Sequence, residues 1–161
     1  MKIRKVVGDR RRYLPLLLLA DEQLDMVERY LDRGDMWVLV EADGADDAEG
    51  VGGAGEALAE CLVTDEGAGV LEIKNLAVVP EHQGRGLGRE LIEHVARTYA
   101  GRYHALLVGT GDSPLTVPFY ERCGFTRSHV VPGFFTRHYD HPIFEGGVQL
   151  RDMVYLKRPL A

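Results

Sequence analysis

A glycine-rich turn between an apolar strand pattern and an amphipathic helix constrains this chain more than any other feature. The turn is Gln83-Gly84-Arg85-Gly86-Leu87-Gly88, and it follows Val78-Val79-Pro80. Glycines at alternate positions leave no side chains where backbone N–H groups must approach a ligand closely. The helix that follows presents unpaired N-terminal amides and the positive end of its dipole at the same place. The turn therefore predicts a phosphate-binding site.

Length and composition favour one ordinary globular domain over residues 1–161, with 45% hydrophobic and 27% charged residues. A net charge of −6 argues against a nucleic-acid-binding protein, and Arg10-Arg11-Arg12 is interpreted as a solvated helix start. Cys61 and Cys123 lack metal-ligand spacing, so we expect free thiols in a reducing compartment and no metal site. Leu16–Leu19 is far shorter than the ~18 apolar residues of a membrane span. We expect a cytoplasmic protein without a signal peptide or a membrane partner.

Hydrophobic periodicity predicts a mixed fold of the α+β (α/β) class. A strand, helix and strand over 69–109 predict a parallel pair within a mostly antiparallel sheet. Residues 43–55 are rich in Gly and Asp and predict an exposed, mobile loop, whereas 132–151 form an aromatic connection that contains His residues. The expected order is β-α-α-β-β-β-α-β-α-β-β, about seven strands flanked by about four helices. Strands are expected at 3–7, 36–42, 56–64, 69–79, 104–109, 125–131 and 152–157, and helices at 11–20, 21–33, 86–100 and after the N-cap Thr116.

The glycine turn does not match two common phosphate-binding motifs. Arg89 stands where a dinucleotide-binding loop needs its third glycine, and no glycine is followed by Lys-Ser or Lys-Thr as in a P-loop. Taken alone, the glycines also allow a turn that binds no ligand.

What remains, Gln83-x-x-Gly86-x-Gly88 after a strand and Pro80, resembles the acetyl-CoA pyrophosphate loop of the GNAT N-acetyltransferase superfamily. Phe119-Tyr120-Glu121-Arg122-Cys123-Gly124-Phe125 resembles the FYxxxGF signature of that family, at a similar distance beyond the loop. The element order resembles that fold along nearly the whole chain. Gly109-Thr110-Gly111 and Asp152-Met153-Val154 are similar to segments of uncharacterised bacterial members. The resemblance implies a single-domain GNAT-like fold with acetyl-CoA as the acetyl donor.

The resemblance also implies which residues bind the donor. Backbone groups of Leu76, Ala77 and Val78 would bind pantetheine, and an N–H near Val78 would polarise the thioester carbonyl. The side chains of Arg85 and Arg89 either add charge at the phosphates or do nothing specific. Asp112 and Ser113 stand where the family often has a cofactor-contacting Asn, and an anionic Asp112 could repel phosphate or orient the amine. The pyrophosphate would be bound by the segment Gln83, Gly84, Arg85, Gly86, Leu87, Gly88 and Arg89.

Two residues are candidates for proton transfer. An alkyl amine has a pKa of ~10.4 and must lose a proton before it attacks. Glu72 is the candidate base, because several family members carry a catalytic glutamate on this strand; the alternative is an outward-facing strand residue. Tyr120 would protonate the leaving sulfur, and the alternative is an aromatic packed beside Phe119.

The acceptor is the least determined part of the prediction. His138, Tyr139 and His141 lie in the aromatic connection, which borders the acceptor pocket in related folds; surface or capping roles are the alternative. The implied reaction moves acetyl from acetyl-CoA to a primary amine in a ternary complex. The amine would belong to a small molecule or a peptide amino terminus, and the net charge mildly favours a cationic acceptor. A non-catalytic acyl-CoA sensor or interaction module is the alternative function. The sequence leaves open whether the protein forms a homodimer.

Overall fold

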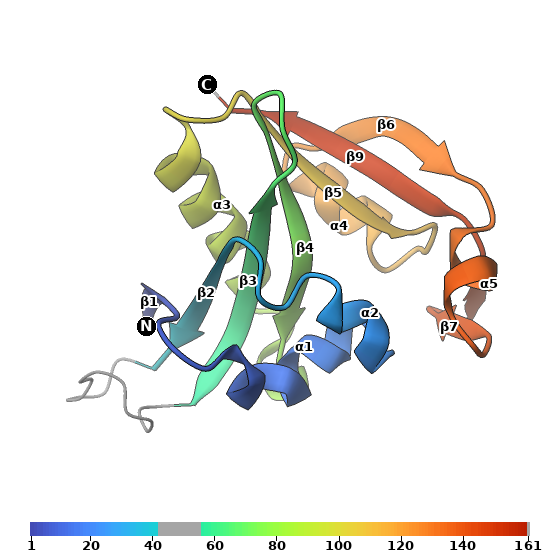
Figure 1. The fold of residues 1–161 in the computed structure, drawn as a ribbon, viewed down its shortest axis with the longest axis horizontal. Helices are drawn as coiled ribbons and strands as arrows, with labels where there is room; N and C mark the ends of the chain where they lie inside the picture. The colour runs from blue at the N-terminus through green and yellow to red at the C-terminus, as the bar shows by residue number, and fades with distance from the viewer. Residues whose placement is uncertain (42–55, 161) are drawn as a thin grey trace. The chain divides into compact units, whose positions relative to one another are not determined.

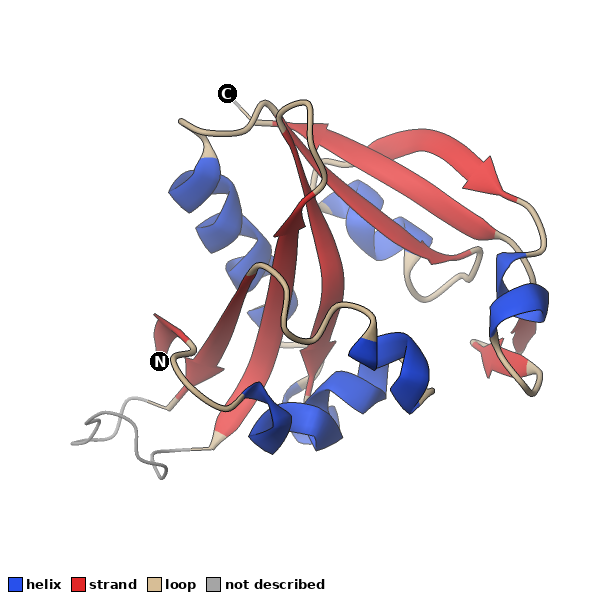
Figure 2. Cartoon of the chain, viewed as in Figure 1, coloured by secondary structure: helices blue, strands red, loops and turns tan. Residues whose placement is uncertain are grey.

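The computed structural model describes residues 1–41 and 56–160. Its strands form a seven-stranded mixed sheet in the order β1-β2-β3-β4-β5-β9-β6 and a two-stranded hairpin, β7-β8 (Figures 1 and 2). The predicted fold class and the predicted order of the main elements are confirmed. The elements are β1 (Lys2–Lys5), α1 (Leu14–Ala20), α2 (Leu24–Glu28), β2 (Asp35–Val40), β3 (Ala57–Asp65), β4 (Val70–Val78), α3 (Leu87–Tyr99), β5 (Ala105–Gly111), α4 (Val117–Arg122), β6 (Thr126–Val131), α5 (Phe134–His138), β7 (Ile143–Glu145), β8 (Val148–Leu150) and β9 (Met153–Pro159), with the 3-10 turns η1 (Arg10–Tyr13) and η3 (Pro80–His82).

Contacts divide the chain into two compact units, which we call the first and second units. The first comprises Met1–Thr64 with Lys74–Arg97, and the second comprises Asp65–Ile73 with Thr98–Ala161. Strand β4 therefore contributes residues to both. The single domain over 1–161 stays a prediction. Residues 43–55, expected to form a mobile loop, lie outside the described residues.

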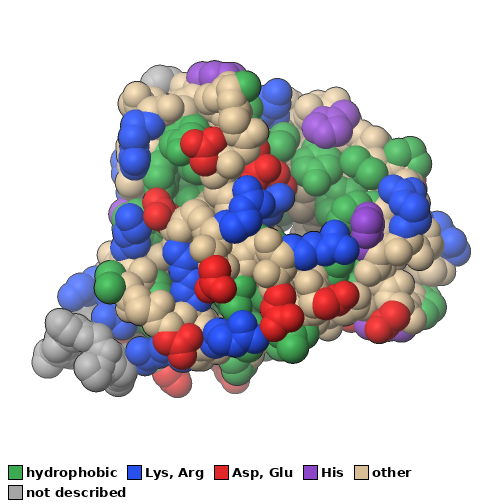
Figure 3. Space-filling view, in the orientation of Figure 1, with side chains coloured by type: hydrophobic (Ala, Val, Ile, Leu, Met, Phe, Trp, Pro, Cys, Tyr) green, Lys and Arg blue, Asp and Glu red, His purple; other side chains and the backbone are tan. Residues whose placement is uncertain are grey.

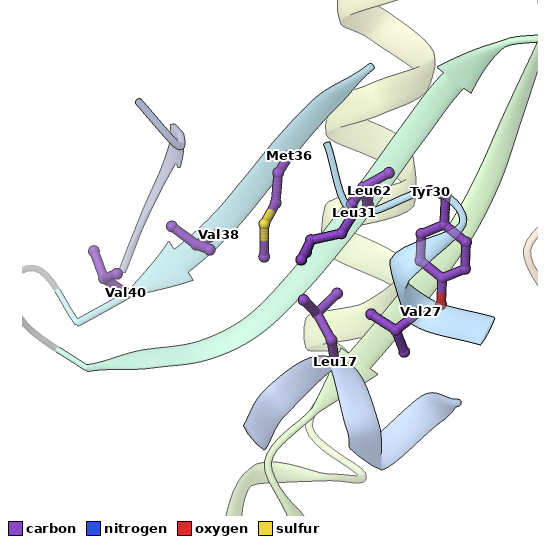
Figure 4. Close-up of a cluster of buried hydrophobic side chains, with 8 residues drawn as sticks. All are labelled: Leu17, Val27, Tyr30, Leu31, Met36, Val38, Val40 and Leu62. Carbon is purple, nitrogen blue, oxygen red and sulfur yellow. The ribbon is translucent and has the colours of Figure 1, made fainter. Parts of the chain in front are cut away.

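Helices pack on both faces of the strands in the first unit. Strands β1, β2 and β3 pair antiparallel, and alternate residues point to opposite faces. On one face the strand side chains meet α1 and the segment around α2 (Figure 4). On the other face Trp37 meets His94 of α3 edge to face, with ring centroids 4.6 Å apart. The cluster on the first face contains Leu17, Val27, Tyr30, Leu31, Met36, Val38, Val40 and Leu62.

Strand β4 begins in the second unit, where Val70–Ile73 pair parallel with β5; the predicted parallel crossover is confirmed. Strands β5, β9 and β6 pair antiparallel. Helix α4 covers one face of these strands, because Thr110 Oγ1 donates to Thr116 Oγ1 at 2.8 Å and Arg158 Nη1 donates to the Cys123 carbonyl at 3.0 Å. The residues that alternate with these along each strand point to the opposite face of the sheet. We call this opposite face the Glu72 face. Among the residues on it are Glu72, Leu107, Gly109 and Tyr155.

Helix α2 is shorter than the predicted helix over 21–33 and ends at Glu28. The guanidinium of Arg10 donates hydrogen bonds to the carbonyls of Leu31, Arg33 and Gly34 at 2.9, 2.6 and 2.6 Å. A side chain from η1 thus supplies partners for carbonyls beyond α2, where a helix end leaves carbonyls without intrahelical partners. Val27 and Leu31 keep helical spacing beyond the end of α2, because the Leu31 N–H donates to the Val27 carbonyl at 3.0 Å, and both side chains are buried in one cluster.

The aromatic connection over 132–151 contains secondary structure that the sequence pattern did not predict. It forms α5 and the hairpin β7-β8, whose turn is Gly146-Gly147 with φ of 59° and 80°. Two glycines with positive φ form the tight turn that suits the twist of a hairpin. Phe135, Ile143 and Leu150 form a buried cluster beneath these elements.

The described residues have a surface of mixed charge (Figure 3), and their thiols are buried. Lys and Arg are interspersed with Asp and Glu on the face drawn in Figure 3. Neither Cys61 nor Cys123 forms a disulfide, and both are buried, at 0% and 3% exposure. Within the described part of the chain, no helix is long and apolar enough to cross a membrane, and no group of three or more His, Cys, Asp or Glu residues could hold a metal ion.

Candidate cofactor and catalytic site

The glycine turn of the first unit has the backbone geometry that a phosphate ligand needs. Gly84 and Gly86 have φ of 80° and 83°, a region that favours glycine, and a Cβ at either position would meet nothing within 4 Å. Their side of the turn is therefore open. Gln83 Nε2 donates to the Val78 carbonyl at 3.0 Å and holds the turn against the end of β4.

Helix α3 begins directly behind this turn at Leu87, and its first hydrogen bond runs from the Glu90 N–H to the Gly86 carbonyl at 3.0 Å. The amides of the preceding residues have no partner within the helix. Arg85 and Arg89 are exposed at the same place. Amides, dipole and guanidinium groups all suit an anion here, so the residues present fit the pyrophosphate of acetyl-CoA.

The last residues of β4, Leu76, Ala77 and Val78, precede the turn on the same unit. Leu76 and Val78 are half-buried, and Ala77 is buried. Sequence reasoning missed Asn75, immediately before them, which is 3% exposed and hydrogen-bonds both Leu17 and Tyr30. The signal was available, because Asn75 is the amide side chain that stands directly before the apolar residues Leu76, Ala77 and Val78.

Both candidate catalytic residues belong to the second unit. Glu72 lies on β4 and is only 7% exposed, so its side chain does not point into open solvent, as the alternative of an outward-facing strand residue would suggest. Tyr120 is 8% exposed on α4, and its ring meets Phe119 and Phe125 edge to face at 5.1 and 5.6 Å. The packing anticipated for Tyr120 is present, and it fixes the ring without excluding a role for the hydroxyl.

The residues at the end of β5 have local partners. Asp112 is exposed and pairs with Arg127 at 3.6 Å, so its charge is partly balanced. Ser113 is buried, and its Oγ accepts the Leu115 N–H at 2.9 Å in the turn before α4. The Thr116 hydroxyl makes no cap bond; instead it donates to the Gly111 carbonyl at 3.3 Å.

The three candidate acceptor residues differ in their surroundings. His138 packs on Phe134 with ring centroids 4.5 Å apart. Tyr139 stacks on Phe135 at 5.3 Å and belongs to the edge of the buried cluster. His141 is exposed and pairs with Asp140 at 2.6 Å. The structure thus places His138 and Tyr139 among aromatic side chains and His141 at the surface.

Known proteins share both the sequence pattern and the fold. The model of the acetyltransferase (GNAT) domain family matches residues 32–127. The uncharacterized N-acetyltransferase YvbK of Bacillus subtilis (strain 168) is 34% identical over 143 residues, which cover 88% of this chain and 84% of that protein.

Solved structures match nearly the full length of the chain. A GNAT family acetyltransferase from Elizabethkingia anophelis with acetyl-CoA bound has a TM-score of 0.86 at 26% identity, covering 99% of this chain and 97% of that one. An IAA acetyltransferase from Bacillus cereus has a TM-score of 0.84 at 28% identity, with 99% of both chains covered. A Bacillus subtilis acetyltransferase in complex with CoA has a TM-score of 0.83 at 30% identity, again with 99% of both chains covered.

Proposed function

This chain belongs to the GNAT acetyltransferase family, and from that membership we propose that it moves acetyl from acetyl-CoA to a primary amine by direct attack in a ternary complex. It is an acetyl-CoA-dependent acetyltransferase. The amine is proposed to belong to a small molecule or a peptide amino terminus. The observation that carries the proposal is the open turn at Gly84 and Gly86 in front of the α3 amides.

Acetyl-CoA supplies the activated acetyl thioester, and the protein is proposed to bind its pyrophosphate at Gln83–Arg89 and its pantetheine at Leu76–Val78. Fixed backbone donors suit this role, because they need no reorganisation when the ligand arrives. The proposed contacts of Asp112 and Ser113 with the donor are secondary, since both side chains already have partners within the second unit.

Glu72 and Tyr120 are the proposed proton-transfer residues. Glu72 would take a proton from the amine, directly or through water, as the nitrogen bonds to the acetyl carbon. The carbon–sulfur bond would then break, and the Tyr120 hydroxyl would give a proton to the sulfur. Direct attack is favoured over a cysteine intermediate because both thiols are buried, and burial raises the pKa of Cys61 well above its ordinary value.

Release of the CoA thiol across a panel of primary amines tests the proposal. The Tyr120→Phe variant should lower kcat by about 100-fold or more while the dissociation constant of acetyl-CoA stays unchanged. Tyr99→Phe is the matched control, because Tyr99 is also buried but lies on α3. Acetyl-CoA binding without thiol release from any amine would favour the non-catalytic sensor. Unchanged kcat in both Tyr120→Phe and Glu72→Gln would contradict their assigned roles.

A further inference from the structure

The ring of Tyr155 lies across the backbone of Gly109 on the Glu72 face. A Cβ placed on Gly109 would lie 2.8 Å from Cε1 and 3.0 Å from Cζ of Tyr155, closer than side chains tolerate. Strand β5 separates β9 from β4, so a ring above Gly109 leans in the direction of β4. Glu72 pairs with Leu107, two residues from Gly109 on the same face. Glycine at 109 thus lets a β9 side chain reach over β5 on the side where the proposed base lies.

The hydroxyl of Tyr155 is available to a ligand. Within the described residues no group hydrogen-bonds it, and the side chain is half-buried. Burial raises the pKa of Tyr155 to about 12, and the negative charge of Glu72 adds to the rise. The phenol is therefore protonated at neutral pH, and its oxygen can accept an amine N–H.

Flat and apolar groups surround this ring. His129 stacks on Tyr155 with ring centroids 4.7 Å apart and an interplanar angle of 9°. Met153 also lies beside Gly109, and it packs against the cluster of Phe135 and Leu150. The Glu72 face thus continues from the carboxylate through an aromatic ring to the apolar side chains beneath α5.

The charges on this face select among amines. Lys157 pairs with Leu107 in the register, so it shares the face with Glu72. The negative charges of Glu72 and Glu66 both act on Tyr155 and attract the ammonium group of an amine. The positive charge of Lys157, in contrast, disfavours a second ammonium group beside it. A primary amine is itself cationic at neutral pH, so this preference agrees with the cationic acceptor that net charge mildly favoured and narrows it to a single positive charge.

We propose that the Glu72 face is the acceptor subsite and that Tyr155 positions a primary amine carried on a flat, apolar body, of the arylalkylamine class. The ring of Tyr155 supports that body, and its oxygen accepts an N–H of the amine that Glu72 deprotonates. This assignment rests on the proposed function, because Glu72 is the base of that reaction.

Binding of amines to the protein in the presence of CoA tests the assignment by calorimetry, without any need for turnover. The probes are 2-phenylethylamine, n-butylamine and 1,4-diaminobutane. The wild-type protein should bind 2-phenylethylamine about tenfold more tightly than either of the others, because aromatic contacts reward a flat ring. Tyr155→Ala should abolish that preference. Tyr155→Phe should keep the preference but weaken the binding of all three amines by about fivefold, which is the effect of losing one hydrogen bond.

Two further variants separate the subsite from general structure. Gly109→Ala keeps every aromatic group but displaces the Tyr155 ring, so it should also abolish the preference. Tyr103→Ala is the matched control, because Tyr103 hydrogen-bonds Asp65 instead and should leave all three affinities unchanged. Thermal unfolding verifies that each variant is folded.

Equal binding of 2-phenylethylamine and 1,4-diaminobutane by the wild-type protein would overturn the assignment, as would a preserved preference in folded Tyr155→Ala. Failure of the proposed function gives a different result. In that case no amine releases thiol from acetyl-CoA, whatever the order of the binding constants. Acetylation of 1,4-diaminobutane alone would keep the transferase reaction and remove the arylalkylamine class.

Discussion

The side-chain amide of Asn75 donates a hydrogen bond to the phenol oxygen of Tyr30 at 2.9 Å. The same Nδ2 donates to the Leu17 carbonyl at 3.0 Å, and the Tyr30 hydroxyl donates to Asp21 at 2.9 Å. Asn75 lies on β4, Leu17 on α1 and Tyr30 just beyond α2. One strand side chain therefore joins both helical segments of the first unit to the strand that leads to the glycine turn.

Replacing Asn75 with Leu should lower the free energy of unfolding by about 1–3 kcal/mol, because buried polar groups lose their partners. Tyr30→Phe removes only the hydroxyl and should cost less, about 1 kcal/mol. Urea unfolding measures both. A Leu variant as stable as the wild-type protein would show that the hydrogen-bonded chain contributes nothing net.

Glu60 on β3 should make stability depend on pH. It is fully buried, and neither carboxyl oxygen has a hydrogen-bond partner among the described residues. Burial raises its pKa well above the ordinary value, so the folded protein holds this proton more tightly than the unfolded chain. Its favourable contribution is complete below the unfolded pKa of about 4.3 and is lost as pH rises through the folded pKa.

The Glu60→Gln variant removes this titration. Urea unfolding between pH 4 and pH 8 should show the free energy of unfolding of the wild-type protein falling with pH relative to that of the variant. Glu90→Gln, at an exposed position on α3, controls for the loss of one negative charge. Parallel curves for the wild-type protein and Glu60→Gln would contradict the prediction.

Three glycine-to-alanine variants should separate backbone strain from ligand binding. Gly86→Ala places a side chain at φ of 83° without a steric clash, so we expect a loss of about 1–2 kcal/mol of stability. It should also weaken acetyl-CoA binding measured by calorimetry. Gly67 has φ of 90° and equally open space in the β3–β4 turn, so Gly67→Ala should lose stability but keep acetyl-CoA affinity. Gly101 has open space and no positive φ, so Gly101→Ala should change neither.

Neighbouring arginines should differ sharply in their effect on stability. Arg10→Ala removes hydrogen bonds to three carbonyls and should lower the free energy of unfolding by about 1–3 kcal/mol. Arg12 lies over the Tyr13 ring at 5.2 Å from the centroid, so Arg12→Ala should cost about 1 kcal/mol at most. Thermal unfolding compares the two variants. Equal losses of stability would show that the carbonyl contacts of Arg10 contribute no more than the contact of Arg12 with Tyr13.

The sequence predicted the bounds of helices and strands well wherever buried and exposed residues follow a regular period along the chain. Strand β4, the turn after Pro80 and helix α3 were predicted within one or two residues of their bounds, because the apolar period changes abruptly at the glycines. The parallel pairing of β4 with β5 followed from the helix between them.

Long-range side-chain contacts explain what the pattern did not predict. A helical turn does begin at Arg10, and Arg11 and Arg12 are exposed as interpreted, but the guanidinium of half-buried Arg10 binds carbonyls more than 20 residues away. The hairpin β7-β8 was missed because its strands have only three residues each, too few to show a period. Tyr155 and Gly109 become neighbours through strand pairing alone, which no local motif encodes.

Each compact unit contains one buried cysteine that is in no disulfide: Cys61 lies in the first unit and Cys123 in the second. The folded protein therefore adds little background to an assay that detects the thiol of released CoA. Under native conditions, a thiol-specific reagent followed by peptide mass analysis would report the opening of each unit separately. The two cysteines thus serve as internal probes of whether the two units unfold together or one at a time.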